Sequence, residues 1–122
     1  MEKEIVAYVK AECCQGRTQF MIAENPDTIM EIMEDYCMGK GEEEEVKIEM
    51  DDKTYKCKIE NGKNNVDFTL KIYRVEDKDL FCCDFIRKSG DYLAFFDIFK
   101  EIQSFINQKF GYEEEGEVQK DY

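Results

Sequence analysis

Alternation of apolar and charged residues in the middle of the chain constrains the fold more than any other feature. Three segments, 46–50, 55–59 and 66–73, each place apolar side chains on one face and polar or charged ones on the other. A period of two residues is that of a strand with one buried face. Polar turns separate the segments, and Asn61-Gly62 is a pair typical of tight hairpins. The sequence therefore predicts a run of antiparallel strands.

Three more strands are predicted on other patterns. Residues 80–86 are almost continuously apolar, which favours a central strand of the sheet. Residues 17–23 alternate clearly, and residues 5–13 alternate only weakly. Asp84 lies within the most apolar of these segments, where a carboxylate needs partners. We expect backbone N–H groups or Arg87 to bind it, and the alternative is an acid with a raised pKa.

Two segments have the period of a helix. Asn25 can cap a helix that begins at Pro26, and Gly39 can end it, so we expect a helix over residues 26–38. The acidic run 42–45 would then separate this helix from the next strand. The helix presents one apolar stripe, formed by Ile29, Ile32, Met33, Tyr36 and Cys37.

The second predicted helix covers residues 91–110 and is closed by Gly111. Its stripe includes Phe95, Phe99 and Ile102. Helices and strands that each hide one face predict an α+β fold with two layers. We expect an antiparallel sheet of four to six strands with both helices on one of its faces.

The chain has 122 residues, the length of one domain. We predict that residues 1–16 form an N-terminal extension with a possible strand and that residues 17–110 form the domain. Residues 111–122 are strongly acidic and poor in apolar side chains, so we expect a disordered tail.

The charge balance excludes several classes of function. With 17 Lys and Arg against 29 Asp and Glu, the net charge is −12, which argues against a nucleic-acid partner. The chain has no His, which removes the commonest general base and zinc ligand, and we expect no metal and no cofactor. Without a secretory signal or a long apolar run, a cytoplasmic or nuclear protein with six reduced cysteines is expected.

Several strings resemble the kinase-associated domain 1, found at the C-termini of serine/threonine protein kinases. The resemblance covers about residues 17–109. Relatives of this type occur in microtubule-affinity-regulating kinases, checkpoint kinase 1 and the α subunit of AMP-activated protein kinase. The matching strings are residues 17–22 with 25–33, residues 66–75, and residues 84–95, which contain Arg87-Lys88-Ser89-Gly90-Asp91.

The resemblance implies a regulatory domain rather than an enzyme, acting by autoinhibition or by binding a subunit or partner. None of the motifs of a kinase catalytic domain occurs in the chain. The expected partner is a kinase catalytic domain, of the same chain or another, or a kinase subunit. The contact would use the open face of the sheet and the turn before the second helix, with Tyr55, Tyr73, Arg74, Arg87, Lys88, Ser89, Gly90 and Asp91 as its residues.

The alternative is a module of the same fold that targets a membrane by binding anionic phospholipid. It needs a basic cluster on one face, and the net charge of −12 opposes it. Residues near the start of the second helix would contribute to an anion site there. The candidate residues are Lys56, Lys58, Lys71, Arg74, Arg87 and Lys88.

Overall fold

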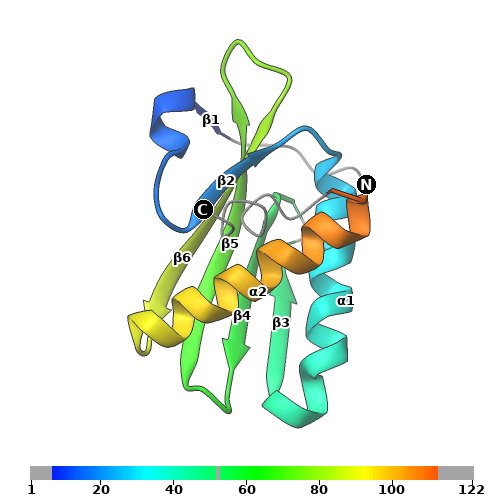
Figure 1. Cartoon of the computed structure of the whole chain (residues 1–122), viewed down its shortest axis with the longest axis vertical. Coiled ribbons are helices and arrows are strands. Elements are labelled where there is room, and N and C mark those ends of the chain that lie inside the picture. Colours follow the sequence, from blue (N-terminus) through cyan, green and yellow to red (C-terminus); the bar gives the residue numbers. More distant parts are fainter. Residues whose placement is uncertain (1–6, 52, 113–122) are drawn as a thin grey trace, which may run out of the picture.

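The computed structural model describes residues 7–51 and 53–112, and the two-layer α+β architecture is confirmed (Figure 1). Helix α2 crosses the sheet diagonally, and α1 runs beside β3. The elements in chain order are β1 (Tyr8–Val9), the 3-10 turn η1 (Ala11–Cys14), β2 (Gln19–Ile22), α1 (Pro26–Glu44), β3 (Val46–Met50), β4 (Lys56–Asn61), β5 (Val66–Val75), β6 (Phe81–Ser89) and α2 (Tyr92–Phe110).

The sheet has the strand order β2-β6-β5-β4-β3, and all four of these pairings are antiparallel. Strand β6 lies inside the sheet, as its apolar sequence indicates, but the middle position belongs to β5. The short β1 pairs with the end of β5 in parallel, next to Arg74 and Val75, and is the exception to the antiparallel pattern.

One core fills the space between the sheet and the two helices. The inward side chains of β3 to β6 belong to the same buried cluster as the apolar stripes of α1 and α2, so both helices pack on one face. Aromatic rings dominate its centre: the ring centroids of Phe85 and Phe99 are 5.2 Å apart, and those of Phe68 and Phe95 are 5.6 Å apart. Burial of each such ring contributes roughly 1.5–3 kcal/mol.

Helix α1 is longer than predicted. It continues through Gly39 to Glu44 and ends at Glu45, whose φ of 54° is left-handed. Contacts distant in sequence hold this last turn, because the backbone N–H groups of Gly62 and Lys63 donate to the carbonyls of Glu45 and Glu44 at 3.0 Å. Most of the acidic run is therefore helical rather than a connection.

The N-terminal segment covers one end of the opposite sheet face. The predicted strand 5–13 is wrong beyond Val9, since a 3-10 turn follows, and residues 1–6 lie outside the described residues. Cys14 in this turn packs with Val75 and Cys82 in a second, smaller buried cluster. Packing of the domain therefore begins before residue 17.

The C-terminal boundary of α2 agrees with the sequence. Gly111, with a φ of 80°, caps the helix and donates its N–H to the carbonyl of Gln108 at 3.1 Å. The Tyr112 hydroxyl donates to the Glu24 carboxylate. The rest of the tail for which we expected disorder, residues 113–122, lies outside the described residues.

Candidate functional site

The residues predicted for the contact surface do not form one patch. Strand register places Lys56, Lys58, Lys71 and Tyr73 on the sheet face that the helices leave open. Tyr55 lies in the core, and the remaining residues lie on the helix side or in the turn before α2. The predicted surface is therefore divided among three parts of the fold.

Three lysines neighbour one another on the open face. Lys56 on β4 is directly opposite Lys71 on β5, and Lys58 follows two residues further along the same strand. None of the three has a carboxylate within ion-pair distance among residues 7–51 and 53–112. The ammonium group of Lys71 lies 5.0 Å from the ring centroid of Tyr73. The pairing with Glu49, Glu60 and Asp67 that would neutralise this face is therefore not formed.

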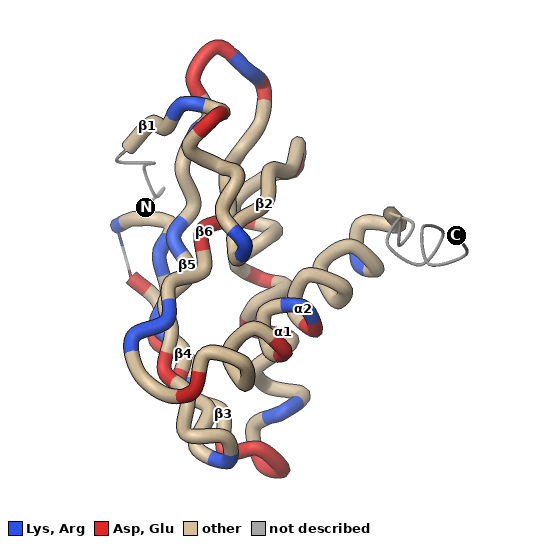
Figure 2. The backbone as a smooth tube through the Cα atoms, turned by 60° about the vertical axis from the view of Figure 1, so that its left-hand side comes forward, with Lys and Arg blue, Asp and Glu red and all other residues tan. Residues whose placement is uncertain are grey.

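Figure 2 shows where the opposite charges gather. Acidic positions concentrate in the β5–β6 hairpin and at the end of α1, and basic positions alternate with further acidic ones along the strands between them (Figure 2). The strand register places four carboxylates on the open sheet face, those of Glu49, Glu60, Asp67 and Asp84, so the lysines form a local basic group on a face whose strand charges balance.

Asp84 has partners other than those predicted. It is directly opposite Lys71 on β5 and Gln19 on β2. Burial raises the pKa of the Asp84 carboxyl, and the hydrogen bond from the Gln19 side chain and the charge of Lys71 oppose this rise. Arg87 does not bind it, because its guanidinium donates to the Gly90 carbonyl at 2.8 Å.

Tyr55 is not an exposed anchor, so this prediction was wrong. Its side chain is buried at 8% exposure because Tyr55 is in phase with Cys57 and Ile59, which face the core. The Tyr55 hydroxyl donates to the Asp27 carboxylate in the first turn of α1 at 3.0 Å. Tyr55 therefore connects the start of β4 to the start of the helix.

Arg74 and Arg87 lie on the helix side of the sheet, away from the three lysines. Arg74 is directly opposite Phe81, lies 5.3 Å from its ring centroid and pairs with Asp79 at 3.5 Å. Arg87 is directly opposite Phe68, and a register shift in β6 leaves Lys88 as the extra, exposed residue. The six-residue anion site expected from the sequence is therefore divided between two faces.

The residues of the turn before α2 have structural roles. Ser89 donates its hydroxyl to Asp67 at 3.1 Å, and Gly90 has a φ of 99°. The Asp91 carboxylate caps α2 by accepting the Ala94 N–H at 2.9 Å. Because the Asp91 carboxylate accepts one of the N–H donors that an external anion would use and brings its own negative charge, the helix start does not favour anion binding.

Sequence reasoning missed the apolar surface beside this turn. Leu93 is 70% exposed at the start of α2 and lies off the core-facing stripe. Tyr92 lies on the edge of that stripe, three residues before Phe95, and the sequence pattern predicted that it would widen the buried face, but it is 38% exposed. Tyr92 stacks on Phe96 with centroids 6.2 Å apart, and the Arg87 guanidinium lies 6.0 Å from the Tyr92 ring. We call Arg87, Lys88, Tyr92 and Leu93 the α2-start surface. The sequence signal that could have revealed this surface is Leu93, an apolar residue two positions before Phe95, because residues two apart on a helix lie on different faces.

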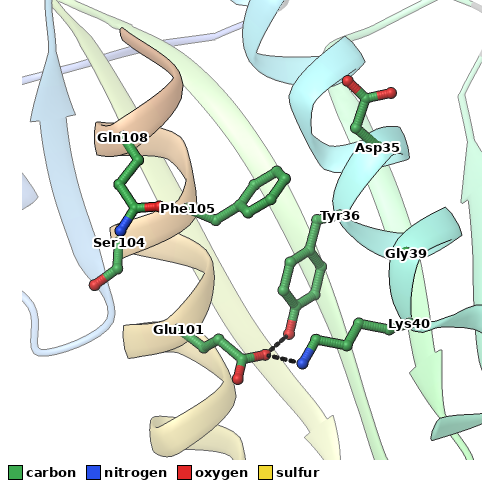
Figure 3. A pocket seen from close by; sticks show the side chains of 8 residues that line it. All are labelled: Asp35, Tyr36, Gly39, Lys40, Glu101, Ser104, Phe105 and Gln108. Carbon is green, nitrogen blue, oxygen red and sulfur yellow. Dashed lines mark hydrogen bonds and ion pairs between the residues drawn. The ribbon is translucent and has the colours of Figure 1, made fainter. Parts of the chain in front are cut away.

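A cleft lies between the two helices, as Figure 3 shows. This cleft has a volume of about 480 Å³ and is lined by residues of α1 between 35 and 40 and of α2 between 101 and 108. At one end the Glu101 carboxylate accepts from the Tyr36 hydroxyl and pairs with Lys40 at 3.2 Å. Lys40 also pairs with Glu44 at 3.1 Å.

This network shifts the pKa values of its members. Burial raises the pKa of the Tyr36 hydroxyl, and its hydrogen bond to Glu101 raises it further. The hydrogen bond to Glu44 raises the pKa of Lys40. Burial alone would raise the pKa of Glu44, but the hydrogen bonds from Lys40 and Asn61 outweigh it and leave the pKa lowered. Both Lys40 and Glu44 are therefore charged at neutral pH.

Neither metal chemistry nor a membrane span is indicated in the described part of the chain. Among its His, Cys, Asp and Glu side chains, no group of three or more is placed to hold a metal ion. No helix there is long and apolar enough to cross a bilayer. The six cysteines are free thiols.

Comparison with protein-family models and with curated proteins finds no match for this chain. The likeness to the kinase-associated domain 1 therefore stays a prediction that depends on the matching strings at residues 17–22, 25–33, 66–75 and 84–95.

Proposed function

We propose that this chain is a non-catalytic regulatory domain that binds a serine/threonine kinase catalytic domain or a kinase subunit. The observation that carries the proposal is the α2-start surface, which exposes Tyr92 and Leu93 beside Arg87. It overlaps the string 84–95 that most resembles the kinase-associated domain 1. The α+β fold agrees with the architecture that the resemblance implies.

The composition of this surface suits a protein partner. Tyr and Arg are among the residue types that contribute most to interfaces, and an exposed leucine adds apolar area that a partner can bury. Its neighbours Gly90 and Asp91 fix the backbone, so the surface is presented by a rigid turn rather than a loose loop. Rigid presentation lowers the entropy lost on binding.

The charge distribution supports the same class of partner. A net charge of −12 steers the chain toward a basic protein and slows its approach to an anionic one. A kinase cleft that recognises basic substrates and an adjoining basic lobe fit this description.

The test measures binding of the chain to serine/threonine kinase catalytic domains of its own source, one at a time, together with their phosphorylation of a peptide. We expect one of them, or an associated kinase subunit, to bind. Leu93→Asp and Arg87→Glu should each weaken this binding at least about tenfold, since hot-spot residues contribute about 2 kcal/mol or more. Met38→Asp is the matched control, because Met38 is a 79% exposed apolar residue on α1.

Two results would contradict the proposal. One is the absence of binding and of any rate change with every catalytic domain and kinase subunit tested. The other is binding that Leu93→Asp and Met38→Asp reduce equally, which would place the contact elsewhere.

The second candidate function is binding of anionic phospholipid through the open sheet face. It is favoured by one observation, the three neighbouring lysines without ion-pair partners in the described residues. The net charge opposes it, so we expect weak co-sedimentation with phosphatidylserine vesicles at physiological salt. Tight binding that Lys56→Glu with Lys58→Glu removes would favour the membrane module over the protein partner.

A further inference from the structure

The cleft between α1 and α2 has the size and position of a binding site. Its volume of about 480 Å³ falls in the range of small-molecule sites, which often lie between helices. Two aromatic rings, Tyr36 and Phe105, meet edge to face beside it, with centroids 5.6 Å apart at 67°. In Figure 3 the polar atoms of Glu101 and Lys40 lie at one end, and Ser104 and Gln108 lie along the α2 side.

Gly39 in the wall of the cleft is not explained by the fold. It lies inside helix α1, where glycine destabilises a helix by roughly 0.5–1 kcal/mol relative to alanine. A Cβ atom at Gly39 would meet nothing within 4 Å, and its φ is not in the left-handed region. Internal packing therefore has no need for a glycine here, whereas an external group that approaches the helix backbone does.

The charges around the cleft favour a cation. Lys40 is shared by two carboxylates, Glu44 and Glu101, so this group of three has a net charge of −1. Asp35 adds another negative charge and has no cation within ion-pair distance in the parts of the chain that the structure describes. Lys109, beside the Phe105 ring, adds a positive charge, so the five groups together carry a net charge of −1. A cationic ligand would reduce this excess.

The aromatic rings at the cleft already attract cations of the chain itself. The Lys40 ammonium lies 5.9 Å from the centroid of the buried Tyr36 ring, and the Lys109 ammonium lies 5.1 Å from that of the partly exposed Phe105 ring. A ligand cation would therefore compete with Lys109 for the Phe105 ring. Cations are drawn to such rings by the negative potential of their faces.

We propose that this cleft binds an arginine side chain of a partner protein. A guanidinium is planar, so it can lie against an aromatic ring and still donate in its plane to carboxylate and amide oxygens. The cleft offers both kinds of acceptor, carboxylates from Asp35 and Glu101 and an amide from Gln108, together with the hydroxyl of Ser104. A lysine ammonium is compact and strongly hydrated, and it would use the rings and the acceptors less well.

This site is distinct from the α2-start surface of the proposed function. It lies between the middle of α1 and the second half of α2, whereas Leu93 is at the beginning of α2. Leu93→Asp should therefore leave arginine binding unchanged, and either proposal can fail without the other.

In the test, the full chain is titrated with three capped tripeptides, and two-dimensional NMR records the chemical shifts of its backbone amides. The peptides have arginine, lysine or the neutral isostere citrulline between two glycines. We expect the arginine peptide to shift amides near Gly39, Ser104 and Gln108. Its affinity should exceed that of the lysine peptide about fivefold and that of the citrulline peptide at least about tenfold, because a charge-assisted hydrogen bond is about twice as strong as a neutral one.

Matched variants separate the cleft from general effects of charge and helix stability. Asp35→Asn should weaken binding, whereas Asp97→Asn removes the same charge from an exposed site outside the cleft and should have a smaller effect. Gly39→Leu should block the site, whereas Gly41→Ala also stabilises α1 but leaves the wall open.

Equal effects of Asp35→Asn and Asp97→Asn would overturn the proposal, since they would show nonspecific attraction to an acidic chain. Unchanged binding to Gly39→Leu, or equal affinity for arginine and citrulline, would also overturn it.

Discussion

Replacement of Gly90 by alanine is expected to destabilise the fold more than the same replacement at Gly39 or Gly111. Gly90 has a φ of 99°, which L side chains rarely adopt. An added Cβ would lie 2.3 Å from the carbonyl oxygen of Asn65 and 2.9 Å from the Cα of Val66. Both obstacles are backbone atoms at the start of the central strand β5, so neither can move aside without disturbing the sheet.

The magnitude follows from these two effects. Backbone strain at such a φ costs about 1–3 kcal/mol, and overpacking against fixed neighbours costs about another 1–3 kcal/mol. The expected loss for Gly90→Ala is therefore roughly 2–6 kcal/mol, a large share of the roughly 5–15 kcal/mol that is typical for total stability.

Two other glycines separate these effects. Gly111 has a φ of 80° but open space around it, so Gly111→Ala should lose only about 1–2 kcal/mol from backbone strain. Gly39→Ala has neither strain nor a neighbour within 4 Å and should gain about 0.5–1 kcal/mol from helix propensity.

Urea unfolding, followed by far-ultraviolet circular dichroism, measures the free energy of unfolding of all three variants. The order of free energies of unfolding should be Gly39→Ala above the natural chain, then Gly111→Ala, then Gly90→Ala. A loss of less than about 1 kcal/mol for Gly90→Ala, or equal losses at Gly90 and Gly111, would refute the reasoning from close contact.

Three further predictions concern single side chains. Burial raises the pKa of Asp84, so its charged form destabilises the fold above that pKa, and Asp84→Asn should raise the free energy of unfolding at pH 7. This gain should shrink as the pH falls through the pKa of Asp84 in the folded chain toward its lower pKa in the unfolded chain. Urea titrations at several pH values measure it. Tyr55→Phe removes the hydrogen bond to Asp27 and should cost about 0.5–1.5 kcal/mol in the same assay. When the native protein is alkylated and the products are followed by mass spectrometry, Cys13 should react first because it is exposed. Burial shields Cys82 and raises the pKa of its thiol, so it should react later, and equal alkylation rates would contradict this.

The elements that were predictable from sequence are those fixed by neighbouring residues. Asn25 accepts the Asp27 N–H at 2.8 Å and Pro26 follows it, so the start of α1 depends on a local motif. The strand at residues 46–50 agrees with its alternation, since the period of two decides which side chains face the core.

The end of α1 was not predictable from local signals. Gly39 favours a helix end, but the helix continues because donors from the β4–β5 turn, Gly62 and Lys63, satisfy its last carbonyls. Nothing in residues 39–45 indicates that these donors lie nearby, since the whole β3–β4 hairpin separates them in sequence.

The candidate site shows the same division between local and long-range information. The alternation along β4 and β5 correctly places Lys56, Lys58 and Lys71 on one face. Alternation along β6 also places Arg87, two residues after Phe85, on the helix side; only the residues after Arg87 escape it, because the register shift at Lys88 changes their phase. A basic cluster counted from sequence therefore overstates the charge that any one face presents.

The acidic network of α1 connects stability to the proposed arginine site. Lys40 forms ion pairs with both Glu44 and Glu101, so the ion pairs that fix the last turn of α1 also define one end of the cleft. This turn contains Gly41 and follows Gly39, and acidic residues at a helix C-terminus oppose the macrodipole, so it is intrinsically weak. A guanidinium that relieves the negative charge would stabilise this turn as it binds. Arginine binding should therefore slow amide exchange in the last turn of α1 and leave exchange near the start of α2 unchanged.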